Sequence, residues 1–336
     1  MLGAEEVPRR GGLARSSGVV VLWAAVIGVL AAIVLMAGAV VGELDASPPW
    51  RVQAGGGDRG TLENLGVEGS ADADADQQVI RLAGSGSNLP LTREIAEAFM
   101  RRWPGKRVIV FESVGSTGGI RAVSDGVVDL GLVSRPFRPA EDGLGLVVLP
   151  YARVAVAAVA NLDVPEQGLS RSGLIDVFAG ERRRWENGAP IVVLQRERGD
   201  SSHAAVDRAL PDFAAVNDTA YRQERWRVVY NDRAMYETLV STPGAVGLLD
   251  VGATQTQALA LKVLELDGVA PTEANLRSGR YPFAKDLSFV SVEQPAGLAG
   301  ELVDFVRSSD GQALIRQRGY IPLAAPLPRL DERGAP

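Results

Sequence analysis

The stretch Arg196-Glu197-Arg198-Gly199-Asp200-Ser201-Ser202-His203 decides how the rest of the chain is interpreted. It follows a strand-like apolar run, Ile191 to Gln195, and leads into a helical pattern, Ala204 to Leu210. A turn with glycine and hydroxyl residues at a strand-to-helix junction offers unpaired N–H groups and the positive end of the helix dipole to an anion. The stretch therefore predicts a site for a tetrahedral oxyanion.

Two earlier junctions have the same character. They are Gly84-Ser85-Gly86-Ser87-Asn88 and Gly115-Ser116-Thr117-Gly118-Gly119. Glycine and serine also simply make tight turns, so one such junction is weak evidence. Three junctions in one chain, without a nucleotide-binding fingerprint, favour an anion site closed from several sides.

Composition excludes several classes of function. The chain has 336 residues, a net charge of −6, no cysteine and one histidine, His203. The negative charge argues against a nucleic-acid surface, and the missing cysteines exclude disulfides, thiolate metal sites, Cys nucleophiles and a lipid-modified N-terminal Cys. We expect no metal and no cofactor. A Ser–His enzyme around His203 would need a third orienting group, so we expect no enzyme and a solvent-facing His203.

The N-terminal region predicts a membrane anchor. Val19 to Val41 is 23 residues without a charge, roughly 35 Å as a helix at about 1.5 Å per residue. Arginines precede this segment and acidic residues follow it, which predicts residues 1–18 in the cytoplasm and the remainder outside. The alternative is a cleaved signal peptide, because Ala37-Gly38-Ala39 resembles a cleavage site.

Low-hydrophobicity segments flank the folded region. Residues 42–78 are rich in Gly, Pro and Asp and predict a flexible tether, and residues 326–336 predict a C-terminal tail.

The folded region predicts two α/β lobes. Strand-like runs at 79–83, 107–111 and 130–133 alternate with helical patterns at 91–103 and 115–123. This βαβαβ order implies a parallel sheet, whose ligands bind outside the carboxyl ends of the strands, where the turns lie. We assign 79–152 and 255–325 to lobe 1 and 153–254 to lobe 2.

Further segments fill in this division. The apolar stretch 144–160, broken by Pro150-Tyr151, is expected to cross into lobe 2. Lobe 2 is expected to hold a short helix face at 174–178, a helix at 232–242 and a strand at 245–249. Strands at 263–266 and 287–291 are expected to return to lobe 1, where helices at 298–306 and 311–318 close the fold.

The motifs, taken together, resemble a known family. Their order is GSGSN, VGSTGGI, DLGLVSRPF, VFAGERRRW, RERGDSS, GRYPFAKDLSF and FVRSSDGQALIRQRGYIPL. This order is similar to the phosphate-binding proteins (PstS-like) of phosphate ABC transporters, within the type II periplasmic binding protein superfamily. The resemblance implies two α/β lobes joined by hinge strands, with a dehydrated phosphate between the lobes.

The resemblance also implies binding residues. By position, the Asn88 side chain and the Leu89 amide would contact phosphate, although the family has a hydroxyl residue at Asn88. Ser116 and the Thr117 amide match the second turn. Ser134 stands where the long form of the family has a carboxylate that accepts the phosphate proton, and many relatives share Ser134-Arg135-Pro136. Arg196 and Ser202 match the third turn. The complete expected set is Ser87, Asn88, Leu89, Ser116, Thr117, Ser134, Arg135, Arg196, Asp200, Ser201 and Ser202.

Asp200 departs from the family, which has a serine at this position. A carboxylate about 4 Å from a bound anion costs on the order of 4 kcal/mol at an effective dielectric near 20. In one interpretation Asp200 faces Arg196 or Arg198, or accepts a phosphate proton, and binding survives. In the other, Asp200 has spoiled the site.

The functional expectation follows from the residues and the resemblance. We expect an extracytoplasmic, monomeric receptor that binds inorganic phosphate or a similar oxyanion and delivers it to an ABC permease, without nucleic acid. The alternative is a membrane-anchored sensor or interaction domain with a degenerate anion site.

Overall fold

The structure, a computed structural model, describes residues 78–323. The expected cytoplasmic segment, anchor, C-terminal tail and all but the last residue of the tether lie outside the described residues. Among residues 78–323, no helix has the length and apolar character needed to cross a bilayer.

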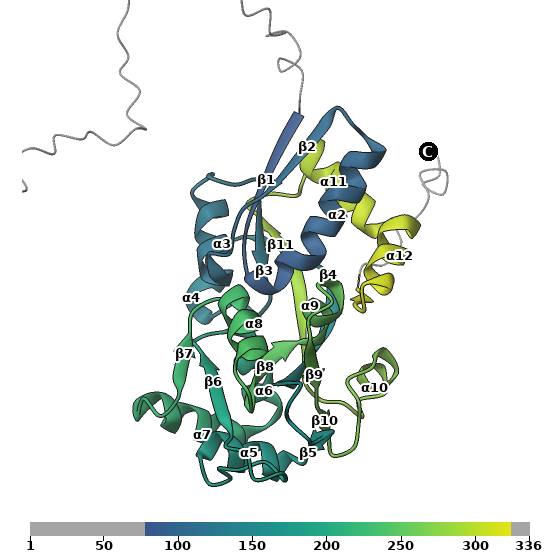
Figure 1. The fold of residues 1–336 in the computed structure, drawn as a ribbon. Coiled ribbons are helices and arrows are strands. Elements are labelled where there is room, and N and C mark those ends of the chain that lie inside the picture. The colour runs from purple at the N-terminus through teal and green to yellow at the C-terminus, as the bar shows by residue number, and fades with distance from the viewer. Residues whose placement is uncertain (1–77, 324–336) are drawn as a thin grey trace, which may run out of the picture. The chain divides into compact units, whose positions relative to one another are not determined.

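The first lobe contains the expected βαβαβ unit (Figure 1). Its elements are β1 (Gln78–Gly84), η2 (Gly86–Asn88), α2 (Leu89–Arg102), β2 (Lys106–Val110), α3 (Gly115–Ser124), β3 (Leu130–Val133) and α4 (Pro139–Asp142), with α11 (Gly297–Arg307), α12 (Ser309–Gln317) and β12 (Ile321–Pro322) from the C-terminal region. Strand β1 pairs in parallel with both β2 and β3, as the alternation predicts. The closing helices also lie where the sequence predicts them.

Helices cover both faces of this sheet. Helix α2 buries apolar residues at spacing four, Leu91, Ile95 and Phe99, and it shares a core with α11. Helix α3 packs through Ile120 and Val123 in a separate cluster on β1 and β3. Because both helices begin at the carboxyl ends of strands, their N-termini lie at the same edge of the sheet (Figure 1).

The second lobe is built around another sheet. Its elements are β5 (Gly168–Leu169), α5 (Arg171–Ala179), β6 (Val192–Arg196), α6 (Ser201–Ala209), α7 (Pro211–Arg222), β7 (Arg227–Val229), α8 (Asp232–Ser241), β8 (Ala245–Asp250), α9 (Val251–Thr256), β9 (Leu261–Val263), β10 (Glu265–Leu266) and α10 (Glu273–Arg277). Strand β6 pairs in parallel with β7 and β8. Helix α6 follows the carboxyl end of β6, and α8 follows that of β7.

Two long strands connect the lobes. Strand β4 (Val147–Asn161) pairs with β11 (Ala284–Ser291) and then continues to pair with β8 of the second lobe. The sequence suggests a break at Pro150, but β4 runs through this residue. The ladder is irregular at this point, however: Leu287 pairs with Ala152 and Ser288 with Pro150, so Tyr151 is an extra residue in β4 next to a proline that offers no N–H to the ladder.

One expected strand is placed wrongly by the sequence. Residues 263–266 do not return to the first lobe, because β9 pairs with the second half of β4 and β10 pairs with β5. Leu264, Leu266, Tyr281 and Phe283 all lie in the core of the second lobe. The return to lobe 1 therefore comes later than the expected boundary at residue 255. Only the strand expected at 287–291 makes it, as β11.

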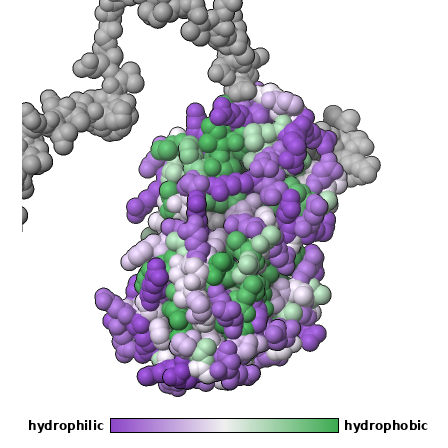
Figure 2. Space-filling model, in the orientation of Figure 1, coloured by the Kyte–Doolittle hydropathy of each residue, from purple (hydrophilic) through white to green (hydrophobic). Residues whose placement is uncertain are grey.

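The surface of the described region is mainly polar. Figure 2 shows hydrophilic side chains over much of the visible face of both lobes, with apolar side chains between them. The exposed large apolar residues include Val127, Leu162 and Val292, which come from separate parts of the chain. Most large apolar side chains are thus buried in the cores, where they pack against the strands and fix the positions of the strand ends.

Candidate anion-binding site

The first lobe contributes two turns without side-chain caps. Helix α2 begins after η2, and neither the N-cap Asn88 nor the η2 N-cap Ser85 makes a side-chain capping bond. Helix α3 begins after Val114, which also cannot cap. Both turns carry hydroxyl residues and no charge. The start of α3 in particular therefore presents backbone donors of the kind that an anion satisfies.

The second lobe contributes a turn that is already capped. Asp200 is the N-cap of α6, and its Oδ1 accepts hydrogen bonds from the amides of Ser202 (3.0 Å) and His203 (2.9 Å). Aspartate is among the preferred N-cap residues because it satisfies the orphan donors with a negative charge. The carboxylate of Asp200 therefore occupies the helix terminus that the sequence predicts for a bound anion.

Arg196 lies among three carboxylates. Its Nη1 is 3.0 Å from Asp232 Oδ1 and 3.4 Å from Asp200 Oδ2, and its Nε is 2.9 Å from Glu197 Oε2. The side chain is 4% exposed, and Nε also donates to the carbonyl of Val229. Arg196 is therefore buried, held in place and already paired in this structure.

The pKa values of the two buried acids beside Arg196, Asp200 and Asp232, shift in opposite directions. Burial alone would raise the pKa of Asp200, but the hydrogen bond with His203 and the charge of Arg196 hold that pKa far below its ordinary value. Burial raises the pKa of Asp232, and the charge of Arg196 does not fully offset it. Asp200 is thus the stably ionised partner of the pair.

The three turns meet at one cavity of about 300 Å³. It is lined by Ser85, Gly86, Ser87, Ser113, Val114, Gly115, Ser116, Arg196, Glu197, Gly199, Asp200, Ser201, Tyr230 and Asp232. Ser87 of lobe 1 and Ser201 of lobe 2 meet in its wall, with their Oγ atoms 3.5 Å apart. The cavity is therefore enclosed by both lobes at the edge where the strands end.

Five of the expected residues line this cavity. They are Ser87, Ser116, Arg196, Asp200 and Ser201. Asp200 faces Arg196, as in the first of the two interpretations. Arg198 instead pairs with Asp218 at the surface.

The other expected residues lie elsewhere. Asn88 is buried, with Nδ2 3.1 Å from Tyr151 Oη, and Ser134 bonds to Ser85 through their Oγ atoms at 2.7 Å. Arg135 forms a bidentate pair with Glu141 and donates to Thr117. Leu89 lines a neighbouring cavity, and Ser202 bonds to Lys285. None of these six residues lines the candidate cavity, and all but Leu89 have a side-chain hydrogen-bond partner elsewhere in the protein.

His203 differs from the expectation. The sequence suggests a solvent-facing residue, but the side chain is 3% exposed and Nδ1 lies 3.1 Å from Asp200 Oδ1. The expectation was wrong because α6 packs its first turn against Phe178 of the lobe core.

Several residues of the site region are absent from the expected set, and the most consequential are Asp232 and Lys285. Asp232 begins α8 directly after β7, which is a fourth strand-to-helix junction that lacks glycine and so gives little signal. Lys285 is a charged residue inside the apolar strand β11, where it is 2% exposed. The strand expected from the sequence begins only at Leu287, so the sequence does not indicate that Lys285 belongs to the hinge strand.

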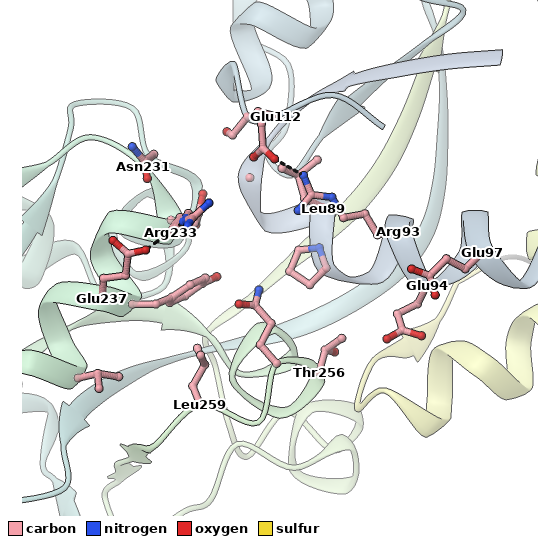
Figure 3. Close-up of a pocket in the computed structure, with 17 residues that line it drawn as sticks. Leu89, Arg93, Glu94, Glu97, Glu112, Asn231, Arg233, Glu237, Thr256 and Leu259 are labelled. Atoms are coloured by element: carbon pink, nitrogen blue, oxygen red, sulfur yellow. Dashed lines mark hydrogen bonds and ion pairs between the residues drawn. The ribbon is translucent and has the colours of Figure 1, made fainter. Parts of the chain in front are cut away.

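A larger cavity of about 940 Å³ adjoins the first, and the two share Gly86, Ser113 and Asp232. Figure 3 shows the ion pairs Arg93–Glu112 and Arg233–Glu237 on its two sides. Its wall carries five carboxylates, from Glu94, Glu97, Glu112, Asp232 and Glu237, but only two arginines. The smaller cavity also holds three carboxylates beside Arg196, so the charge balance does not separate the two cavities. The smaller cavity is the better candidate because the glycine- and hydroxyl-bearing turns of both lobes meet there.

Comparison with known proteins gives consistent results. The family described as PBP superfamily domain matches residues 66–310. The Phosphate-binding protein PstS of Bacillus subtilis is 28% identical over 258 residues, which cover 73% of this chain and 80% of the relative.

Solved structures share the fold. A putative phosphate ABC transporter substrate-binding protein from Clostridium perfringens, crystallised with bound phosphate, aligns with a TM-score of 0.63 at 22% identity. The alignment covers 73% of this chain and all of that one. An ABC-type phosphate transport receptor from Vibrio cholerae aligns with a TM-score of 0.53 at 23% identity, over 72% of this chain and 99% of the other. At these identities the likeness establishes the two-lobed fold.

Proposed function

The chain belongs to the PBP superfamily, and from that premise we propose that it is a solute-binding protein for inorganic phosphate or a similar tetrahedral oxyanion. The observation that carries the proposal is the convergence of turns from both lobes on one cavity that holds Arg196. The similarity to the PstS of Bacillus subtilis supports phosphate as the ligand.

The lobes contribute differently to binding. The uncapped turn at α3 and the hydroxyls of Ser87 and Ser116 supply neutral donors from lobe 1. Arg196 supplies the positive charge from lobe 2, and Ser201 supplies a hydroxyl. A ligand that contacts both sets stabilises the closed arrangement, because it binds that arrangement better than one with the lobes apart.

The carboxylates set a condition on binding. Glu197, Asp200 and Asp232 already pair with Arg196. A phosphate must therefore share the guanidinium with them or displace one of them. Asp200 is the direct competitor, because it holds both the guanidinium and the first amides of α6.

We extend the proposal to the route of transport. The protein would work outside the cytoplasm as a monomer, held by an uncleaved helix at residues 19–41, and would pass the anion to an ABC permease without chemical change. A tether near a permease raises the effective concentration of the receptor. Retention in the membrane fraction after a high-salt wash, and its loss on deletion of 19–41, tests the anchor; release of a shortened protein would refute it.

The function itself is tested by calorimetry on the full chain in mild detergent. We expect saturable binding of one phosphate per chain and a weaker response to sulfate, which has no proton to donate to the site's carboxylates at neutral pH. Absence of heat with phosphate would refute the proposed function.

A further inference from the structure

Lys285 lies beneath the candidate anion site. It projects from the hinge strand β11, and its side chain is fully buried. Its Nζ is 2.6 Å from Ser87 Oγ, 2.8 Å from Ser202 Oγ and 3.2 Å from Ser201 Oγ. One ammonium group thus contacts hydroxyls from both lobes.

The chemistry of these contacts fixes the direction of the hydrogen bonds. An ammonium group has three protons and no lone pair, so each serine oxygen must accept from Lys285. A hydroxyl that accepts keeps its own proton for another partner. Ser87 and Ser201 both line the 300 Å³ cavity, and their mutual distance of 3.5 Å exceeds the usual 2.5–3.0 Å of an O–H···O bond. A bond between them is weak at this distance and uses only one of the two protons, so at least one hydroxyl proton is left to donate into the cavity.

Asp250 is the counter-charge of Lys285, and it does not compete with the serines for the ammonium protons. Asp250 Oδ2 lies 3.3 Å from Nζ but in no hydrogen-bond geometry, and it has no other hydrogen-bond partner among the described residues. The other oxygen of Asp250 accepts from the amide of Ala253 and caps α9. Asp250 thus balances the charge of Lys285 while the three serines take its protons.

We propose that Lys285 is a positioning residue for the bound anion, which holds the hydroxyls of Ser87 and Ser201 as donors toward the cavity. This proposal rests on the proposed function. The ammonium does not line the cavity, so it acts through the serines. Because these come from opposite lobes, the same contact aligns the two halves of the site.

The test removes the buried pair as a unit. Lys285→Met with Asp250→Asn eliminates both charges with similar side-chain sizes and leaves an amide that can still cap α9. Calorimetry with inorganic phosphate on the full chain should show an affinity loss of about tenfold or more. The matched control is Arg153→Met with Asp286→Asn, an ion pair between the hinge strands β4 and β11 whose side chains are 47% and 39% exposed and which contacts none of the serines. This control should bind as the wild type does.

A second readout separates positioning from a merely structural role. Ser87→Ala should weaken phosphate binding in the wild type and have less than about half that effect, in fold-change, in the Lys285→Met/Asp250→Asn background, because the hydroxyl is no longer oriented there. If the methionine variant does not fold, Lys285→Gln with Asp250→Asn provides the same comparison.

The outcomes distinguish the two claims. Wild-type phosphate binding together with undiminished binding by the double variant, or an equal effect of Ser87→Ala in both backgrounds, would overturn the role of Lys285 and leave the proposed function standing. Failure of the wild type to bind phosphate would overturn both.

Discussion

The two halves of the candidate site differ in how they treat a negative charge. The lobe 1 half, formed by the turns before α2 and α3, has glycines, hydroxyls and no side-chain caps. The lobe 2 half holds Arg196, but it surrounds that guanidinium with Glu197, Asp200 and Asp232 and caps α6 with Asp200. The lobe 1 half therefore has donors available for a bound anion, whereas in the lobe 2 half the carboxylate of Asp200 already occupies the helix terminus.

This difference indicates which residues determine the affinity of the site for an anion. Free backbone donors make an anion site without cost in charge, whereas a buried carboxylate at the same place competes with the ligand. We infer that lobe 1 supplies most of the ligand contacts and that Asp200 limits the affinity contributed by lobe 2.

The largest expected effect comes from removing the positive charge of Arg196 in the lobe 2 half of the site. Arg196→Gln leaves three carboxylates without their cation, so we expect a loss of about 3–5 kcal/mol in the free energy of unfolding, together with loss of phosphate binding. Urea unfolding followed by circular dichroism measures the first effect and calorimetry the second.

The matched control for Arg196 is two residues away. Arg198 pairs with Asp218 at the surface, where both side chains are more than half exposed. Arg198→Gln should cost less than about 1 kcal/mol, because exposed ion pairs contribute little. Equal losses for the two variants would contradict the central position of Arg196.

A smaller effect is expected from the pH dependence of the two acids beside Arg196. The native pKa of Asp200 is depressed, so its stabilisation is present above the unfolded value of about 3.9 and is lost as the pH falls below it. The native pKa of Asp232 is raised, so its charge costs stability at neutral pH and protonation in mild acid relieves that cost.

Unfolding of Asp200→Asn and Asp232→Asn between pH 7 and pH 3 separates these signs. Asp200→Asn should be less stable than the wild type at pH 7 by about 1 kcal/mol or more, with a difference that shrinks below pH 4. Asp232→Asn should match or exceed the wild type at pH 7, since the amide still accepts from Arg196. The same sign for both variants at pH 7 would be inconsistent with the opposite pKa shifts.

The sequence predicts the lobes well because their signals are local. The βαβαβ order of lobe 1, the helices after each glycine-rich turn and the closing helices follow from apolar periodicity and turn residues. The strand at 263–266 was misplaced because an apolar run does not say which sheet it joins; its pairing with β4 depends on tertiary context.

The site could be predicted only in part, for a similar reason. The positions of Ser87, Ser116, Arg196 and Ser201 follow from their strand-to-helix junctions. The roles of Asp232 and Lys285 do not, because they arise from the approach of α8 and β11 to turns far away in sequence. Conversely, Asn88 and Ser134 have suitable chemistry at suitable positions, but their side chains are used within lobe 1.

The most direct test of the account is calorimetric titration of the full chain with phosphate, wild type beside Asp200→Ser. Serine keeps an N-cap hydroxyl and removes the competing charge. Asp218→Ser, an exposed change of the same charge, serves as the control. The account predicts that the wild type binds phosphate, that Asp200→Ser binds it at least about tenfold more tightly, and that the control binds as the wild type does. Weaker binding by Asp200→Ser than by the wild type, or no binding by either, would contradict it.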